Sequence, residues 1–166
     1  MNPLLSVVIL ARDDRRHIAA ALTDMHRGLS KRAESYEILV TDAGVTDGTM
    51  DIASRMATVL PGMRIASSAA DARGAIRIFA DADDMPTADR IASFLPYFEQ
   101  GFHVVAFRPS GLFARPILAA ISAYAADAVF SDMRERGTLT TDVGGAFRTE
   151  AIARAQAVGY RIKHLS

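Results

Sequence analysis

The 166-residue sequence contains no cysteine, no tryptophan and only two lysines, Lys31 and Lys163. The absence of cysteine excludes disulfide bonds, thiolate metal ligands and a thiol nucleophile. Nineteen basic residues balance nineteen acidic ones, so no overall positive field attracts nucleic acid, and we expect no nucleic-acid partner. Half of the residues are hydrophobic and 23% are charged, which is typical of a soluble globular protein.

The sequence also lacks a hydrophobic run of the roughly 20 residues that a membrane-spanning helix needs. The closest approach is PILAAISAYAADAVF, residues 116–130, which contains Asp127 and follows Arg115. We interpret it as an amphipathic or buried helix and expect any homo-oligomer to form through it. The N-terminal sequence has no basic leader and reaches acidic residues too early for a signal peptide, so we expect a cytoplasmic protein without a transmembrane segment.

Segments with strand and helix patterns alternate along the chain. Apolar or β-branched runs predict strands at 5–11, 36–41, 63–66, 75–80, 102–107 and 159–165. Apolar residues at helical spacing predict helices at 14–29, 47–60, 87–98 and 116–130, and from Thr149 onwards. Alternating strands and helices predict a single α/β domain, residues 1–166, with a mostly parallel sheet.

Acidic residues directly follow three of the predicted strands: Asp13 and Asp14, then Asp42, then the cluster Asp81, Asp83 and Asp84. Ligands of α/β sheets bind outside the carboxyl ends of the strands. Carboxylates this close repel one another unless a cation lies between them, and a hard divalent cation takes oxygen ligands. The structural alternative is a set of strand-to-helix turns, with Asp84 capping the helix that begins near Thr87.

Three of these segments carry a resemblance to a known family. They are LSVVILARDDRRHIAAAL (5–22), YEILVTDAGVTDGTMDIA (36–53) and IFADADDMPT (78–87). They resemble the N-terminal half of the family 2 inverting glycosyltransferases, and most of all the polyprenyl-phosphate sugar transferases. The resemblance covers roughly residues 5–95. It implies a GT-A-like (nucleotide-diphospho-sugar transferase) domain of three α/β/α layers, and a hexosyltransferase-like enzyme that uses a nucleotide-diphosphate sugar.

The same resemblance implies roles for individual residues. Asp42 would accept a hydrogen bond from the base of a UDP- or GDP-sugar. Asp81 would lie near the ribose and the metal ion, and Asp83 would bind the Mg²⁺ or Mn²⁺ that bridges the diphosphate. The metal would neutralise the leaving nucleoside diphosphate as the glycosidic bond breaks.

Ala11, Asp13 and Asp14 occupy the family's first nucleotide-binding motif, which here reads Leu-Ala-Arg-Asp-Asp. The family's proline, tyrosine and glutamate are replaced in this motif, and Ala43 stands where a second Asp is usual. Between the strands at 63–66 and 75–80 the chain is too short for the family's extra helix, so Arg73 would partly replace a basic residue near the diphosphate.

The second half of the sequence matches less of the family. TDVGGAFRTEAI, residues 141–152, is similar to a Gly-rich turn and Phe-Arg that precede a helix in those enzymes. The family's general base and its acceptor motif are missing, and Glu150 is the only nearby carboxylate. We therefore assign no catalytic residue, and the sugar and the acceptor stay unidentified.

Two alternatives remain open. The first is a glycosyltransferase-like module without catalysis, which binds a nucleotide sugar or a protein partner. The second, more remote, is a phosphorylation receiver domain with Asp13 and Asp14 as its acidic pair and Asp42 as the phosphorylated residue. The spacing from Asp14 to Asp42 leaves room for only one helix, where a receiver needs a helix, a strand and a helix.

Overall fold

The computed structural model describes residues 1–82, 85–107, 118–136 and 145–166. Within these ranges seven strands form one sheet in the order β3-β2-β1-β4-β6-β5-β7. The strands are β1 (Leu5–Ala11), β2 (Tyr36–Asp42), β3 (Met63–Ile65), β4 (Ile76–Asp81), β5 (Val104–Phe107), β6 (Leu118–Ser122) and β7 (Ile162–Leu165). Every neighbouring pair is parallel except the two that involve β6. The predicted α/β class with a mostly parallel sheet is confirmed.

The strand β1 lies in the middle of the parallel part, between β2 and β4, and all seven of its residues are buried. Its side chains alternate between two hydrophobic cores. Val7 and Ile9 pack in one core, and Val8 and Leu10 pack in the other. A strand covered on both faces needs an unbroken apolar run, which is why the sequence of β1 shows no polar alternation.

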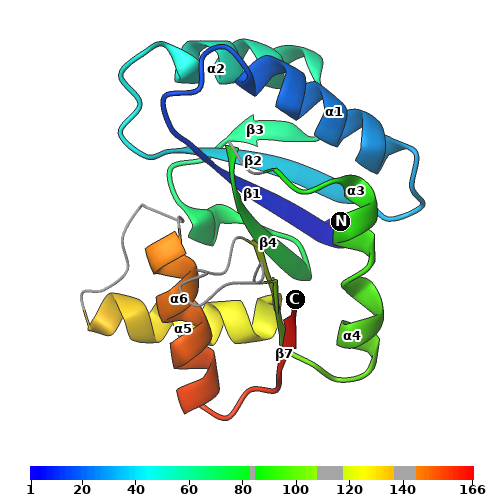
Figure 1. Ribbon diagram of the computed structural model, residues 1–166, viewed down its shortest axis with the longest axis vertical. Coiled ribbons are helices and arrows are strands. Elements are labelled where there is room, and N and C mark those ends of the chain that lie inside the picture. Colours follow the sequence, from blue (N-terminus) through cyan, green and yellow to red (C-terminus); the bar gives the residue numbers. More distant parts are fainter. Residues whose placement is uncertain (83–84, 108–117, 137–144) are drawn as a thin grey trace.

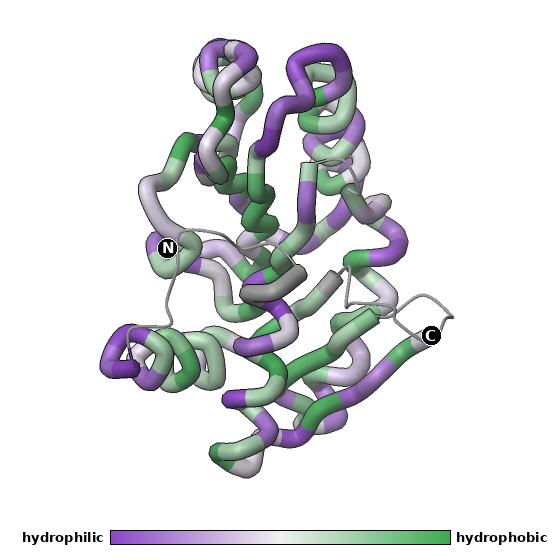
Figure 2. Tube along the Cα trace, turned by 60° about the vertical axis from the view of Figure 1, so that its left-hand side comes forward, coloured by the Kyte–Doolittle hydropathy of each residue, from purple (hydrophilic) through white to green (hydrophobic). Residues whose placement is uncertain are grey.

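Helices cover both faces of the sheet (Figure 1), which gives the predicted three layers. One face carries α1, α2, α3 and α4, and the other carries α5, α6 and a short 3₁₀ helix, η1. Their bounds are α1 (Ile18–Ser30), α2 (Thr49–Val59), η1 (Ala69–Asp71), α3 (Ala88–Ala92), α4 (Leu95–Glu99), α5 (Ala123–Glu135) and α6 (Gly145–Ala157). Figure 2 shows hydrophobic residues concentrated along the central strands, while the helices mix hydrophilic and hydrophobic residues. No helix in the described ranges is long and apolar enough to cross a membrane.

The prediction of one helix over residues 116–130 is wrong. Within the described part of this segment, Leu118–Ser122 forms β6 and the helix α5 begins only at Ala123. Ile121, expected on a helix face, is fully buried in the sheet. Asp127 forms an ion pair of 2.7 Å with the buried Arg77 of β4. A short apolar run does not distinguish a strand from a buried helix, and here pairing with both β4 and β5 decides for the strand.

Three smaller predictions also differ from the structure. The expected helix over 87–98 is two helices, because Pro96 lies in the first turn of α4 and cannot continue a helix that began earlier. The side chain of Thr87 caps α3 by accepting a hydrogen bond from the amide of Arg90, while Asp84 lies outside the described residues. The last helix begins at Gly145 rather than Thr149.

A buried carboxylate ties β1, β2 and β3 together at the amino ends of the strands. Glu37 Oε1 accepts hydrogen bonds from the Ser6 hydroxyl (2.6 Å) and the Arg73 amide (2.7 Å), and Oε2 accepts one from Arg64 Nε (3.1 Å). Burial raises the pKa of Glu37, but these hydrogen bonds outweigh it and leave the pKa below its ordinary value. Next to this network, the Gly74 amide donates to the Ser6 hydroxyl at 2.7 Å.

Candidate active site

The carboxyl ends of three adjacent strands bring the predicted site residues to one edge of the sheet. Ala11 of β1 is in register with Asp42 of β2, and Leu10 of β1 is in register with Asp81 of β4. Asp42 and Asp81 therefore flank the end of β1, one strand away on either side. Because neighbouring strands are about 4.8 Å apart, the two backbones are about 10 Å apart. A nucleotide lying across the end of β1 can reach both.

Asp42 is exposed, and only one of its carboxylate oxygens accepts hydrogen bonds from the described residues. Its Oδ1 accepts hydrogen bonds from the amides of Gly44 (2.9 Å) and Val45 (2.8 Å), which closes a turn after β2. Gly44 takes a positive φ of 87° in this turn, a conformation that glycine adopts without strain. The turn chemistry thus uses one oxygen of Asp42 and leaves Oδ2 available to a ligand.

Asp13 joins the loop after β1 to the loop after β2. Its Oδ1 accepts hydrogen bonds from the amides of Thr46 (2.7 Å) and Asp47 (3.3 Å), and its Oδ2 accepts one from the Thr46 hydroxyl (2.8 Å). Both oxygens therefore have protein partners. The structure gives Asp13 a loop-bracing position, which the sequence pattern could not distinguish from a ligand contact.

Asp47 completes this connection from the other loop. It accepts hydrogen bonds from the hydroxyl and amide of Thr49 and from the amide of Arg15. The hydrogen bond from the Thr49 hydroxyl, with smaller contributions from the two amides, holds the pKa of Asp47 below its ordinary value. Asp47 lies two residues before α2 and accepts a hydrogen bond from the amide of Thr49, the first residue of that helix.

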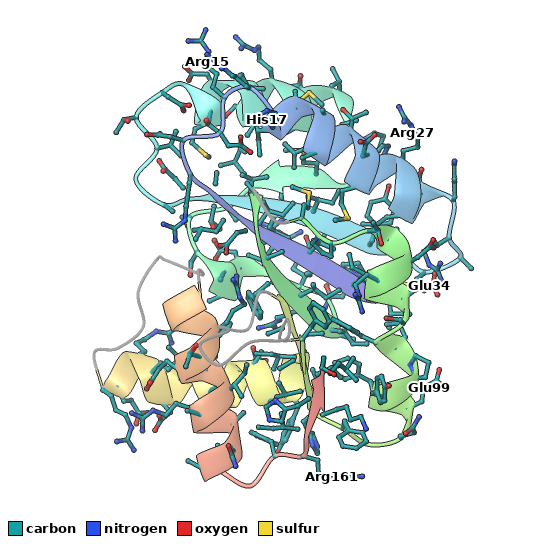
Figure 3. All side chains as sticks on the ribbon, viewed as in Figure 1. Arg15, His17, Arg27, Glu34, Glu99 and Arg161 are labelled. Carbon is teal, nitrogen blue, oxygen red and sulfur yellow. The ribbon has the colours of Figure 1, made fainter. Side chains whose placement is uncertain are left out.

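Asp14 lies four residues before the start of α1, and one of its oxygens has no hydrogen-bond partner among the described residues. Its Oδ1 is 2.9 Å from Nδ1 of His17, and the imidazole must carry its proton on Nδ1 to donate to a carboxylate. Oδ2 is buried and accepts no hydrogen bond within the described ranges. Arg15 and His17, labelled in Figure 3, lie at the beginning of α1, at the end of the molecule opposite Arg161.

Asp81, the last residue of β4, pairs with a residue that the sequence reasoning did not select. Nη2 of Arg148 in α6 lies 2.8 Å from Asp81 Oδ2, and the side chains of Arg148 and Asp81 are 2% and 20% exposed. The other oxygen, Oδ1, is buried and has no hydrogen-bond partner in the part of the chain that the structure describes. The Phe-Arg similarity in residues 141–152 pointed to this segment, but nothing in the sequence linked Arg148 to Asp81.

Arg73 lies at the other edge of the sheet, and Ala11 lies at the end of β1 with its side chain buried. Arg73 follows η1 and lies just before β4, beside Pro3 and Ser35, at the amino ends of the strands. It is thus at the edge opposite Asp42 and Asp81, because the strands β1, β2 and β4 run parallel. Ala11 is fully buried, and its carbonyl accepts a hydrogen bond from the Ala43 amide. Asp83 lies outside the described residues.

The described residues fit a metal ion that takes few protein ligands. Across these ranges no group of three or more His, Asp or Glu side chains could hold a metal by itself. Asp81 Oδ1, however, is a buried carboxylate oxygen without a donor. Mg²⁺ is commonly held by one or two carboxylates together with substrate phosphates and water. A metal held here would take Asp81 as one such ligand and would depend on a bound diphosphate for others.

Comparison by sequence finds no protein-family profile and no characterised protein that matches this chain. Comparison of structures does find neighbours. The mannosyltransferase PcManGT from Pyrobaculum calidifontis, in complex with GDP-Man and Mn²⁺, aligns with a TM-score of 0.64 at 16% identity. Residues 1–349 of TarS from S. aureus align with a TM-score of 0.64 at 15% identity, and their complex with UDP-GlcNAc with 0.61 at 16%.

These alignments cover 99–100% of this chain but only 55–58% of the neighbouring chains. The chain therefore spans a little over half the length of these neighbours. A further neighbour, 4-diphosphocytidyl-2C-methyl-D-erythritol synthase from Anaerococcus prevotii, aligns with a TM-score of 0.66 at 9% identity and is covered to 86%. At such identities the likeness establishes the fold, which is GT-A-like.

Proposed function

We propose that the chain binds a nucleotide-diphosphate sugar across the end of β1 and acts as a metal-dependent, inverting glycosyltransferase. Asp42 Oδ2 would accept a hydrogen bond from the base of a UDP- or GDP-sugar. Asp81 would contact the ribose and the metal, and Asp83 would hold Mg²⁺ or Mn²⁺. Asp14 is the third contact that we assign to the nucleotide, whereas Asp13 braces the loops.

One observation supports this proposal most directly. Four buried side-chain atoms lack a hydrogen-bond partner in the described chain, and three of them are carboxylate oxygens, of Asp14, Asp81 and Asp132. Asp132 lies on α5 and faces Arg154 at 3.7 Å, which leaves Asp14 and Asp81 without a cation at these oxygens among the described residues. A buried carboxylate oxygen without a donor is costly and rare. Both of these lie after strands that end at the ligand-binding edge of the sheet. A bound nucleotide with its metal would supply the hydroxyl groups and the cation that these oxygens lack.

The protein would contribute binding and orientation to the reaction. The bound metal would act as a Lewis acid that stabilises the departing nucleoside diphosphate. The residues at the edge hold the base, the ribose and the diphosphate so that the anomeric carbon faces the acceptor. The acceptor and the base that deprotonates it stay unassigned.

Transfer of a nucleotide from a triphosphate is less consistent with the loop after β1. A triphosphate is typically held by the backbone amides of a glycine-rich loop. Residues 12–17, Arg-Asp-Asp-Arg-Arg-His, contain no glycine, and the amides of Asp14 and Arg15 donate to Thr49 and Asp47.

Calorimetry with UDP- and GDP-sugars, with and without Mn²⁺, tests the proposal. We expect binding that requires Mn²⁺, and we expect Asp83→Ala to abolish it without loss of the fold, because a metal ligand is lost while carboxylate repulsion is relieved. Glu99→Ala, a change of the exposed carboxylate on α4 labelled in Figure 3, serves as control. Absence of binding to the wild-type protein with Mn²⁺ contradicts the proposal.

The second candidate function is a binding module of the same fold without catalysis, since no general base is assigned among the residues that the structure describes. Both functions predict binding of a nucleotide sugar. They differ in turnover, so release of free UDP or GDP from the bound donor over hours discriminates between them. Donor binding without release, with the sugar donors and candidate acceptors tested, supports the binding module.

A further inference from the structure

We propose that Arg148 is a positioning residue that fixes the carboxylate of Asp81 so that only Oδ1 is presented to the donor nucleotide and its metal. This inference rests on the proposed function and extends it to α6, which covers the face of the sheet opposite to α1. It assigns a task to a buried arginine that the sequence does not connect with the nucleotide.

The first argument is burial. Arg148 is among the largest fully buried side chains in the described chain. Removing a guanidinium from water is costly unless it is paired and hydrogen-bonded. Its Nη2 lies 2.8 Å from Asp81 Oδ2, which is the short distance of a charge-assisted hydrogen bond. A buried arginine aimed at a strand-end carboxylate holds that carboxylate in one rotamer.

The second argument is that the two oxygens of Asp81 have different environments. Oδ2 is taken by Arg148, whereas Oδ1 is buried and accepts nothing within the described ranges. Side chains that orient a ligand residue commonly affect metal affinity by 10- to 100-fold. With Oδ2 bound to Arg148, Asp81 contacts the metal or the ribose through Oδ1 only. The guanidinium also offsets the negative charge of the carboxylate, which weakens its attraction for a metal ion that arrives without a nucleotide.

The third argument is that α6 is well anchored. Its residues Ala151, Ile152 and Ala155 are buried in the second hydrophobic core. Arg154 forms ion pairs with Glu150 in the same helix and with Asp132 of α5. The base of the Arg148 side chain is thus fixed by packing, which is what a positioning residue needs.

The test measures the dissociation constants of UDP and GDP in the presence of Mn²⁺ for a set of variants. We expect Arg148→Met to weaken nucleotide binding by about 10- to 100-fold and Arg148→Lys to weaken it less, because lysine keeps the charge but not the planar fork. Arg134→Gln, which removes an exposed arginine of α5 without touching Asp81 or α6, should leave the affinity unchanged. Urea unfolding of each variant separates stability from binding.

A double-mutant cycle separates positioning from a general structural effect. If Arg148 acts through Asp81, adding Arg148→Met to Asp81→Asn causes no further loss of affinity. Should Arg148→Met alone not fold, because it leaves the Asp81 carboxylate without its partner, Arg148→Lys takes its place in the cycle.

The outcomes distinguish this inference from the proposed function. No binding of nucleotide to the wild-type protein overturns both. Binding to the wild type that Arg148→Met or Arg148→Lys leaves unchanged overturns the inference alone. So does an effect of Arg148 that is fully additive with Asp81→Asn.

Discussion

The substitution Asp42→Asn separates the two tasks that the structure gives to this side chain. Asp42 Oδ1 accepts hydrogen bonds from the amides of Gly44 and Val45. In the variant, the amide oxygen of asparagine takes these two bonds, since the reverse orientation would place its NH₂ against two N–H donors. The NH₂ then stands where Oδ2 was, so the imide N–H of uracil or guanine meets a donor instead of an acceptor.

The magnitude follows from the loss of one hydrogen bond to a charged acceptor. Such a bond is worth about 1.5–3 kcal/mol, so the dissociation constant of UDP or GDP should rise by about 10- to 150-fold. Pyrophosphate has no base, and its affinity should stay the same within about twofold. The free energy of unfolding should fall by less than about 1 kcal/mol, because Asp42 is exposed and the turn keeps its two hydrogen bonds.

Calorimetry with UDP, GDP and pyrophosphate, each with Mn²⁺, measures these affinities side by side. Asp42→Ala is the companion variant: it loses the turn hydrogen bonds as well, so stability and nucleotide affinity should both fall. Equal weakening of UDP and pyrophosphate by Asp42→Asn would refute the assignment and make Asp42 a structural turn residue only.

Two further predictions concern the amino edge of the sheet. Glu37→Gln should lower the free energy of unfolding at pH 7 by about 1–3 kcal/mol, because the charged acceptor of the Ser6 and Arg64 donors is lost. Folding lowers the pKa of Glu37, so its contribution to stability is complete above the unfolded value of about 4.3 and is lost as the pH falls through the folded pKa. The free energies of unfolding of the wild type and the variant, measured in urea from pH 7 to pH 3, should therefore converge. A constant difference between them would contradict the reasoning. Gly74→Ala should destabilise by about 1–3 kcal/mol or more, because its Cβ would lie 2.5 Å from the Ser6 amide nitrogen. Gly159→Ala is the comparison variant: its added Cβ meets nothing within 4 Å, but φ is +88°, so we expect a loss of stability of about 1 kcal/mol. Equal melting temperatures for Gly74→Ala and Gly159→Ala would argue against the steric account.

The sequence by itself determined the parallel half of the sheet and the edge at which the acidic residues gather. The strands β1, β2 and β4 were predictable because strands buried on both faces need uninterrupted apolar runs. Asp42 and Asp81 were predictable edge residues because each directly follows such a run. That Asp13 braces two loops was not predictable, since a carboxylate after a strand looks the same in sequence whether its donors come from a ligand or from a neighbouring loop.

The tertiary structure alone decided three features that depend on contacts between distant residues. Residues 118–122 form a strand because their backbone pairs with β4 on one side and β5 on the other, although the same apolar run also suits a helix. Arg73 lies at the edge opposite the acidic residues, where its amide donates a hydrogen bond to Glu37 of β2. The pairing of Asp81 with Arg148 joins residues 67 positions apart, and only the packing of α6 on the sheet brings them together. Local sequence determines the hydrophobic periodicity and the turn residues, whereas pairs of side chains this distant in the chain are determined by how the helices pack on the sheet.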